Sequence, residues 1–179
     1  MTTLPGEAIV HADGRLVFQD RSFRCALGRA GVVEAARKHE GDGGTPTGLL
    51  PLRRLYFRAD RGPIPPCALA RVPIGPDDLW CDDPAHRDYN RLVRRPFDAR
   101  HEVLWRDDAL YDIVAELGWN DAPVLPGRGS AIFLHLARAD YAPTEGCVAL
   151  TRPDLLAVLA TGLTALRVLP AGNTNYPSD

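Results

Sequence analysis

Paired cysteine motifs, long apolar runs and an excess of one charge are all missing from this sequence. The four cysteines, Cys25, Cys67, Cys81 and Cys147, form no Cys-x-x-Cys pair, which argues against a zinc ribbon or a thioredoxin-like redox site. An even number of cysteines would permit disulfides in an exported protein. A chain of 179 residues does not need them for its stability.

The near balance of acidic and basic residues and the lack of long apolar stretches exclude further classes of protein. With 21 basic and 23 acidic residues the net charge is −2, so composition gives no support for a nucleic-acid or anionic-membrane partner. No apolar stretch approaches the ~20 residues that a membrane-spanning helix needs. The start, MTTLPGEAIVHADG, lacks the basic and apolar regions of a signal peptide. A cytoplasmic location is therefore expected as encoded, or the periplasm or cell wall if translation begins upstream of Met1.

Proline and glycine are what the sequence has in abundance. There are 16 of each, and the proline content is well above the usual ~5%. Many turns favour a mostly β protein with one or two short helices. With no internal repeat or linker, residues 1–179 are predicted to form a single domain, with residues 170–179 as a flexible tail.

Alternating or short apolar runs predict the strands. Asp13-Gly14 favours a tight turn, so residues 8–10 and 16–18 are predicted to form a hairpin. Cys25 lies in a predicted strand and is expected in the core, since free cysteine is usually buried. Further strands are predicted at residues 23–27, 49–57, 69–74, 103–106, 111–117 and 164–169.

Two other segments are candidates for a helix. Thr151 precedes Pro153 and Asp154, a pattern typical of a helix start, and leucines follow at helical spacing until Gly162. Residues 32–39 suit either a short helix or an irregular segment.

Residues 80–93 are predicted to be a long polar loop. This loop contains Cys81, Asp82, Asp83 and His86, so metal binding was considered. Their spacing matches no closed tetrahedral site, and no metal is predicted.

The segment from residue 129 to 150 carries the strongest chemical signal. If residues 130–137 form a strand, Ile132, Leu134 and Leu136 share one face, and His135 projects from the other with Phe133. Alone, such a histidine is more often structural. Cys147, however, follows twelve residues later in a Thr-Glu-Gly-Cys turn, and a thiol needs a base such as histidine to become nucleophilic.

These residues resemble those of a known family. A histidine on a strand followed by Ser/Thr-x-Gly-Cys and an aliphatic residue is the signature of the L,D-transpeptidase catalytic domain (YkuD-type) family. Here it is His135 and then TEGCV at residues 144–148. The family's upstream Gly-Asp-x-x-Thr-Pro-x-Gly element is matched by GDGGTPTG at residues 41–48, whose glycines allow close approach of backbone amides to a ligand.

The resemblance implies a β-sandwich or barrel fold and a cysteine-dependent acyl transfer without a cofactor. Cys147 would be the acylated nucleophile, His135 the general base and acid, and amides near Gly146 the oxyanion hole. The substrate would be a peptidoglycan stem peptide or muropeptide: a tetrapeptide donor would lose D-Ala, and the thioester would pass to an amine. The candidate substrate contacts are Thr45, Thr47, Arg128, Ser130, Thr144 and Glu145.

Several alternatives remain open. Many family members have histidine before Gly-Cys and arginine two residues after the cysteine, where this chain has Glu145 and Ala149. Glu145 would disfavour a nearby thiolate, orient His135, or meet a basic group of the substrate. The other functions considered are an L,D-carboxypeptidase or amide hydrolase on muropeptides and a non-catalytic peptidoglycan-binding module. A zinc site built from Cys147 and His135 is a more remote option.

Overall fold

The computed structural model describes residues 5–172, so most of the predicted 170–179 tail lies outside the described residues. The order of elements is as follows: β1 (Glu7–His11), β2 (Arg15–Phe18), β3 (Arg21–Arg24), β4 (Val32–Val33), β5 (Thr45–Pro46), β6 (Gly48–Phe57), β7 (Arg71–Pro73), β8 (Asp78–Cys81), β9 (Arg91–Arg94), β10 (His101–Val103), β11 (Ile113–Leu117), β12 (Phe133–Leu136), β13 (Val148–Leu150), α1 (Arg152–Ala160) and β14 (Ala165–Val168). The predicted mostly β fold is confirmed, with one helix in the described part of the chain.

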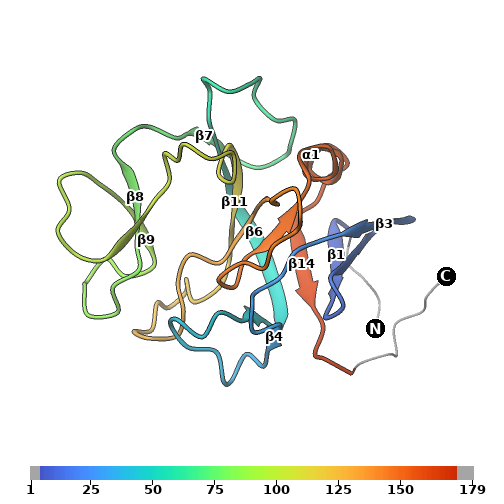
Figure 1. Cartoon of the computed structure of the whole chain (residues 1–179), viewed down its shortest axis with the longest axis horizontal. Helices are drawn as coiled ribbons and strands as arrows, with labels where there is room; N and C mark the ends of the chain where they lie inside the picture. The colour runs from blue at the N-terminus through green and yellow to red at the C-terminus, as the bar shows by residue number, and fades with distance from the viewer. Residues whose placement is uncertain (1–4, 173–179) are drawn as a thin grey trace.

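Most strands belong to one large, nearly closed sheet that resembles a barrel (Figure 1). Its order is β13-β12-β11-β6-β14-β1-β2-β3, with β7 paired to β6. A three-stranded sheet, β10-β8-β9, lies to one side, and β4 pairs with β5.

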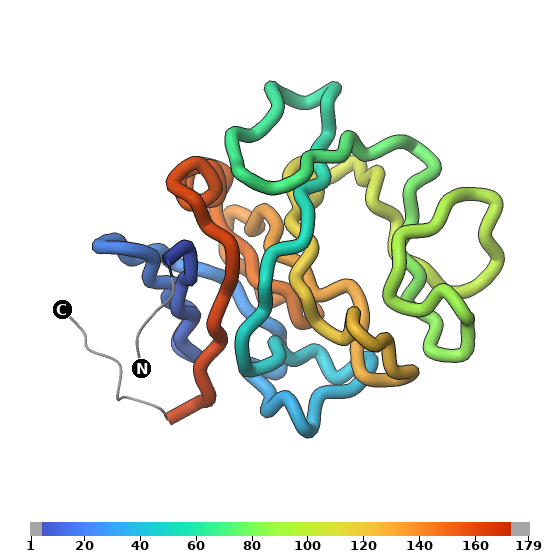
Figure 2. Tube along the Cα trace, turned by 180° about the vertical axis from the view of Figure 1, so that it is seen from behind, coloured from blue at the N-terminus to red at the C-terminus, as the bar shows by residue number. Residues whose placement is uncertain are grey.

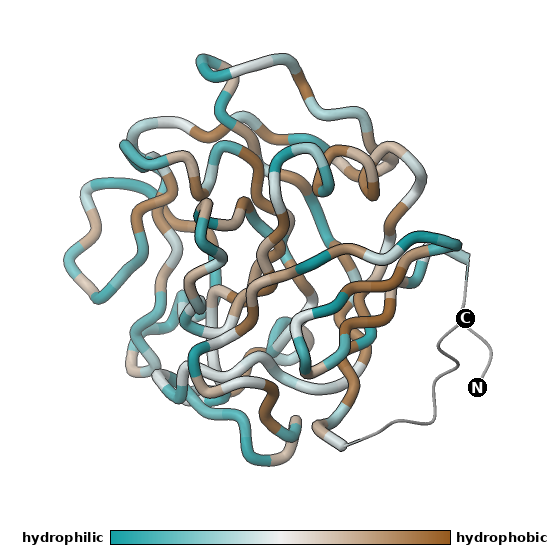
Figure 3. The backbone as a smooth tube through the Cα atoms, turned by 45° about the vertical axis from the view of Figure 1, so that its right-hand side comes forward, coloured by the Kyte–Doolittle hydropathy of each residue, from teal (hydrophilic) through white to brown (hydrophobic). Residues whose placement is uncertain are grey.

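The long strand β6 runs through the middle of the large sheet. Figure 2 shows it between β14 and β11, in agreement with its pairing to both strands. Because side chains alternate along a strand, Leu55 enters the main core while its neighbour Tyr56 enters a second core beneath the three-stranded sheet. Figure 3 shows the most apolar segments along the strands and the hydrophilic ones mainly in the outer loops.

The N-terminal hairpin forms where the sequence predicts it. Gly14 has φ +83°, its N–H donates to the His11 carbonyl at 3.1 Å, and the Asp13 carboxylate accepts the Arg15 N–H at 3.1 Å. A positive φ costs glycine little, so this turn follows from the Asp-Gly step. Cys25 is 4% exposed in the main core, as predicted.

Helix α1 also begins as predicted. The Thr151 hydroxyl accepts the Asp154 N–H at 3.3 Å, and this cap satisfies one of the free amides of the first turn. Leu155, Val158 and Leu159 are buried in the main core, where α1 packs near β12. Within residues 5–172, no helix has the length and apolar character that crossing a membrane requires.

Two secondary-structure predictions need correction. The predicted 80–93 loop contains the end of β8 and the start of β9, whose turn is held by a hydrogen bond of 3.0 Å from Trp80 Nε1 to Asn90 Oδ1. Strand β9 has only two apolar residues, the half-buried Leu92 and Val93, between two exposed arginines, so it lacks an alternating pattern. Of the two alternatives for residues 32–39, the irregular segment is the one observed: β4 pairs with β5, and a turn follows.

The second correction concerns residues 103–106. Strand β10 ends at Val103, and Arg106 turns away to make a bidentate ion pair with Asp108, with N–O distances of 2.8 and 2.7 Å. The alternation that predicted a strand here gives no sign of the ion pair between Arg106 and Asp108.

Strands β11, β12 and β13 form one end of the large sheet. Strand β12 pairs with β11 in antiparallel fashion and with β13 in parallel fashion. As a result His135 lies between Val114 and Ala149, and the chain enters β13 immediately after Cys147.

Candidate active site

The turn before Cys147 requires its glycine and its threonine. Gly146 has φ +131°, and a Cβ built on it would lie 2.8 Å from the Gly44 carbonyl oxygen. The Thr144 hydroxyl accepts the Gly146 N–H at 3.2 Å and donates to the Cys147 carbonyl at 2.7 Å. The Thr-x-Gly-Cys pattern thus fixes a turn that presents the cysteine.

The glycine-rich segment at residues 41–48 supports this turn from behind. The Asp42 carboxylate accepts hydrogen bonds from the backbone N–H groups of His39 and Gly44, both at 2.9 Å. The same carboxylate binds the ammonium of buried Lys38 at 2.6 Å. Because Asp42 holds Gly44 in place, the Gly44 carbonyl can lie against Gly146.

Cys147 is a buried thiol in the resting structure. Its Sγ–H donates to the Ala131 carbonyl at 3.2 Å, and its sulfur accepts the Phe133 N–H at 3.4 Å. Burial, aided by the negative charge of Glu102, raises the pKa of the Cys147 thiol to about 12. The resting cysteine is therefore protonated at neutral pH.

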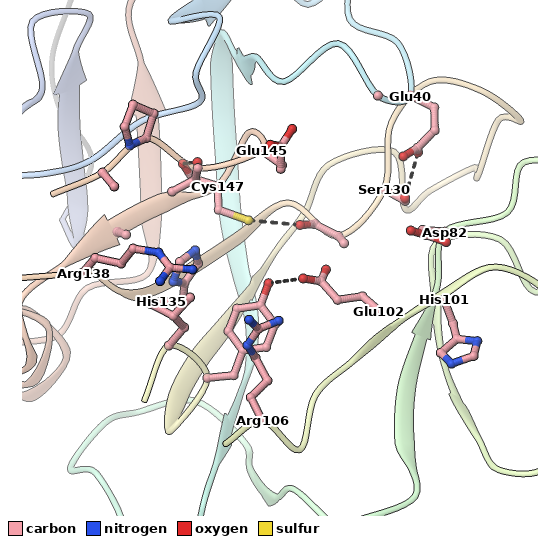
Figure 4. Close-up of a pocket in the computed structure, with 18 of the residues that line it drawn as sticks. Glu40, Asp82, His101, Glu102, Arg106, Ser130, His135, Arg138, Glu145 and Cys147 are labelled. Atoms are coloured by element: carbon pink, nitrogen blue, oxygen red, sulfur yellow. Dashed lines mark hydrogen bonds between the residues drawn. The ribbon is translucent and has the colours of Figure 1, made fainter. Parts of the chain in front are cut away.

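His135 faces the same pocket from β12, as the predicted strand faces require. Its Nδ1 donates to the Leu136 carbonyl at 2.9 Å, which leaves Nε2 as the proton acceptor. Burial lowers the pKa of His135 to about 4, so the resting imidazole is neutral. Figure 4 shows the His135 ring and the Cys147 sulfur within one pocket, while the thiol hydrogen bond runs to Ala131.

The pocket has a volume of about 610 Å³, and its lining mixes many charged side chains with apolar ones. Besides Cys147, His135 and Tyr111, the charged and titratable side chains that line it are Lys38, Glu40, Asp82, Arg100, His101, Glu102, Arg106, Arg138 and Glu145. These residues come from the 38–41 segment, the three-stranded sheet and the chain after β12. A polar peptide fits such a lining better than an apolar ligand does.

Tyr111 joins the histidine to one wall of this pocket. Its ring meets the His135 ring edge to face, with centroids 5.2 Å apart, and its hydroxyl donates to Glu102 Oε1 at 2.6 Å. Burial raises the pKa values of both Tyr111 and Glu102. Neither residue is a predicted site residue, because no local motif links residues 102 and 111 to residue 135.

Three of the six predicted substrate contacts line the pocket, namely Ser130, Thr144 and Glu145. The Ser130 hydroxyl donates to Glu40 Oε2 at 2.8 Å, and Thr144 holds the turn before Cys147. Glu145 forms an ion pair with Arg29 at 2.8 Å, and its side chain is 77% exposed. It therefore points toward Arg29 and solvent rather than toward His135.

The other three predicted contacts do not line the pocket. The guanidinium of Arg128 donates to the carbonyls of Ala35 and Ala36 at 2.6 and 3.0 Å, so it ties two loops together. The Thr45 hydroxyl accepts the Gly28 N–H and lies 3.5 Å from the Cys147 carbonyl, on the side away from the pocket. The Thr47 hydroxyl accepts the Ala35 N–H.

The side chains considered for metal binding are engaged separately. Asp82 binds Arg100, Asp83 accepts the Ala85 N–H, and Cys81 is buried in the small sheet. Between residues 5 and 172, no group of three or more His, Cys, Asp or Glu side chains is arranged to hold a metal ion.

Comparison with known proteins agrees with this arrangement. No curated protein and no solved structure matches the chain. The family model described as "YkuD: L,D-transpeptidase catalytic domain" matches residues 7–168, from the first strand to the last, and includes the cysteine turn, the histidine strand and the glycine-rich segment. The chain therefore belongs to the YkuD family of L,D-transpeptidase catalytic domains.

Proposed function

We propose that this protein is a cysteine-dependent acyltransferase that acts on peptidoglycan stem peptides. The observation that supports the proposal most directly is a thiol and a neutral imidazole in one polar pocket, with the imidazole Nε2 available as a base. Family membership supports an L,D-transpeptidase type of activity. The identity of the nucleophile, the base and the peptide donor is our proposal.

In the acylation step, His135 takes the thiol proton as sulfur attacks the donor amide. A thiol with a pKa of about 12 is rarely ionised at neutral pH, so proton transfer to Nε2 accompanies formation of the C–S bond. The Sγ–H group must first rotate away from the Ala131 carbonyl. The C–N bond then breaks, and His135 returns its proton to the amino group of the departing D-Ala.

The negative charge that develops on the carbonyl oxygen needs a donor close to the sulfur. The amide N–H of Cys147 has no hydrogen-bond partner among residues 5–172, whereas the Gly146 N–H is already bound to Thr144. We assign the Cys147 N–H as an oxyanion donor, fixed by the turn that Gly146 and Thr144 hold. A donor held in place before the reaction stabilises the transition state without a reorganisation cost.

The thioester can pass to an amine or to water. Transfer to an amine makes the protein a transpeptidase, and transfer to water makes it a carboxypeptidase. Product analysis with a disaccharide-tetrapeptide, with and without an added amine, separates these two outcomes.

The decisive test is intact mass spectrometry after incubation with a disaccharide-tetrapeptide or a carbapenem. We expect a covalent adduct on the wild-type protein and none on Cys147→Ala. A matched control is Cys67→Ser, since Cys67 is a free, partly buried thiol outside the pocket. Undiminished labelling of Cys147→Ala would refute the assigned nucleophile.

A further inference from the structure

Most charged side chains that line the pocket have a partner of opposite charge. Lys38 binds Asp42 at 2.6 Å, Arg106 binds Asp108 at 2.7 Å, and Glu145 binds Arg29 at 2.8 Å. Arg100 binds both acidic groups on its side of the pocket, Asp82 at 3.0 Å and Glu40 at 3.5 Å. These charges hold the pocket walls together and are largely compensated before any substrate enters.

Glu102 and Arg138 are different from these paired residues. Within the described part of the chain, neither side chain has an ion pair within 4.0 Å. In Figure 4 the two residues lie to either side of the His135 ring. Arg138 is exposed, so water solvates its charge, whereas Glu102 is partly buried. An unpaired charge in a partly buried site is costly unless a ligand supplies the opposite charge, so Glu102 marks a place for a cationic group of the substrate.

The environment of Glu102 limits what this carboxylate can do. Its Oε1 accepts the Tyr111 hydroxyl at 2.6 Å, and its Oε2 has no hydrogen bond to another described residue. Tyr111 in turn packs against His135, so this tyrosine links Glu102 to the proposed base. Glu102 is also the charged group with the largest effect on the Cys147 thiol. The Glu102 carboxylate is thus held by Tyr111 in the same pocket as the Cys147 sulfur, with one oxygen free.

We propose that Glu102 binds the ammonium group of the acceptor and takes one proton from it before the amine attacks the thioester. This inference rests on the proposed function and concerns its second half, deacylation by an amine. An ammonium ion cannot act as a nucleophile because it has no free electron pair. A partly buried carboxylate both attracts the cation and, since burial raises its pKa, accepts a proton more readily than an exposed carboxylate does.

The proton balance of this step is complete. The acceptor R–NH₃⁺ gives one proton to the Glu102 carboxylate and becomes R–NH₂. Its nitrogen forms a C–N bond to the thioester carbon, and the C–S bond breaks. The nitrogen loses its second proton through His135 to the departing Cys147 sulfur, which restores the thiol. Glu102 then releases its proton to solvent. Water, which is uncharged, gains nothing from the carboxylate's attraction for a cation.

The test measures how the acyl-enzyme divides between an amine and water. The acyl-enzyme is formed from a disaccharide-tetrapeptide, and the ratio of amine adduct to hydrolysed product is measured with two acceptors. Glycine carries an ammonium group at neutral pH, whereas hydroxylamine is largely unprotonated. For Glu102→Gln we expect the glycine-to-water ratio to fall by about ten- to a hundredfold, and the hydroxylamine-to-water ratio to stay within about twofold of wild type.

Glu116→Gln is the matched control. Glu116 also accepts a hydrogen bond from a tyrosine hydroxyl, that of Tyr56 at 3.1 Å, and burial also raises its pKa, but it lies outside the pocket. Glu116→Gln should therefore leave both the glycine-to-water ratio and the hydroxylamine-to-water ratio at the wild-type value. Retained acylation of Glu102→Gln shows that the variant is folded and that the thiol still reacts.

The possible outcomes separate the two proposals. Normal acylation with a glycine-to-water ratio unchanged in Glu102→Gln overturns the role of Glu102 and leaves the proposed function intact. An equal loss with both acceptors also overturns it, because a general structural defect does not distinguish charged from neutral nucleophiles. Failure of the wild-type protein to acylate overturns the proposed function and this inference together.

Discussion

Replacement of Gly146 by alanine tests whether the two turns at the site depend on one another. The added Cβ would lie 2.8 Å from the Gly44 carbonyl oxygen. The fold would also force the alanine to adopt a φ of +131°, a backbone region that alanine disfavours. Holding a non-glycine residue in such a region costs about 1–3 kcal/mol, and the steric overlap adds about 1–3 kcal/mol. We therefore expect Gly146→Ala to lower the free energy of unfolding by about 2–6 kcal/mol.

The same substitution should also damage the reaction, because Cys147 directly follows Gly146. A shift of the nucleophile by about 1 Å can lower a rate by about a hundredfold. Urea denaturation reports the stability loss, and the rate of carbapenem acylation, followed by mass spectrometry, reports the loss at the site.

Gly127→Ala is the control for backbone strain alone. Gly127 has φ +77°, but a Cβ at this position would meet nothing within 4 Å. We expect this variant to lose only about 1–2 kcal/mol and to acylate normally. If Gly146→Ala loses no more stability than Gly127→Ala and acylates at the wild-type rate, the contact with Gly44 does not shape the site.

Two further predictions concern the core and His135. Leu155→Ala should cost about 2–5 kcal/mol in urea denaturation, because Leu155 is 0% exposed on the buried face of α1. The partly buried Leu156 should lose less when replaced by alanine, and equal losses would contradict the described packing. The unfolded chain protonates His135 near pH 6.5 and the folded chain only near pH 4, so acidification across this range should remove about 3 kcal/mol of stability that is fully present above pH 6.5. Urea denaturation at several pH values should show a smaller pH-dependent loss for His135→Asn than for wild type, and equal losses would refute the buried neutral imidazole.

Features that depend on neighbouring residues could be predicted from the sequence. The Asp13-Gly14 turn, the Thr151 cap and the two faces of the strand around His135 each arise from a few adjacent residues. Such signals survive in the folded protein because the backbone geometry that they favour is compatible with the surrounding sheet.

Features that depend on contact across the fold were missed. Glu102 reaches the pocket because β10 pairs with β8, and the end of β8 lies in the segment predicted to be a loop. The four residues of β8 are all buried, whereas its partner β9 has half-buried residues only between two exposed arginines, so the pair shows no shared alternation.

Arg128 illustrates a second limit of sequence reasoning. A cation close to the histidine strand is a reasonable substrate ligand, but the carbonyls of Ala35 and Ala36 bind its guanidinium instead. Every residue has a carbonyl, so no side-chain pattern indicates which arginine will bind backbone.

The buried environment of Cys147 also bears on how the protein withstands oxidants. Oxidation of cysteine proceeds through the thiolate, and folding moves this thiol from the ~8.5 of an unfolded chain to a pKa of about 12. The folded protein therefore keeps Cys147 in the form that peroxide attacks slowly, and in the proposed mechanism the thiol reacts only when a substrate is positioned for proton transfer. The same thiol is most vulnerable while the chain is being synthesised, before Gly44 and Gly146 come together, so oxidative damage should accumulate in immature molecules rather than in the folded protein.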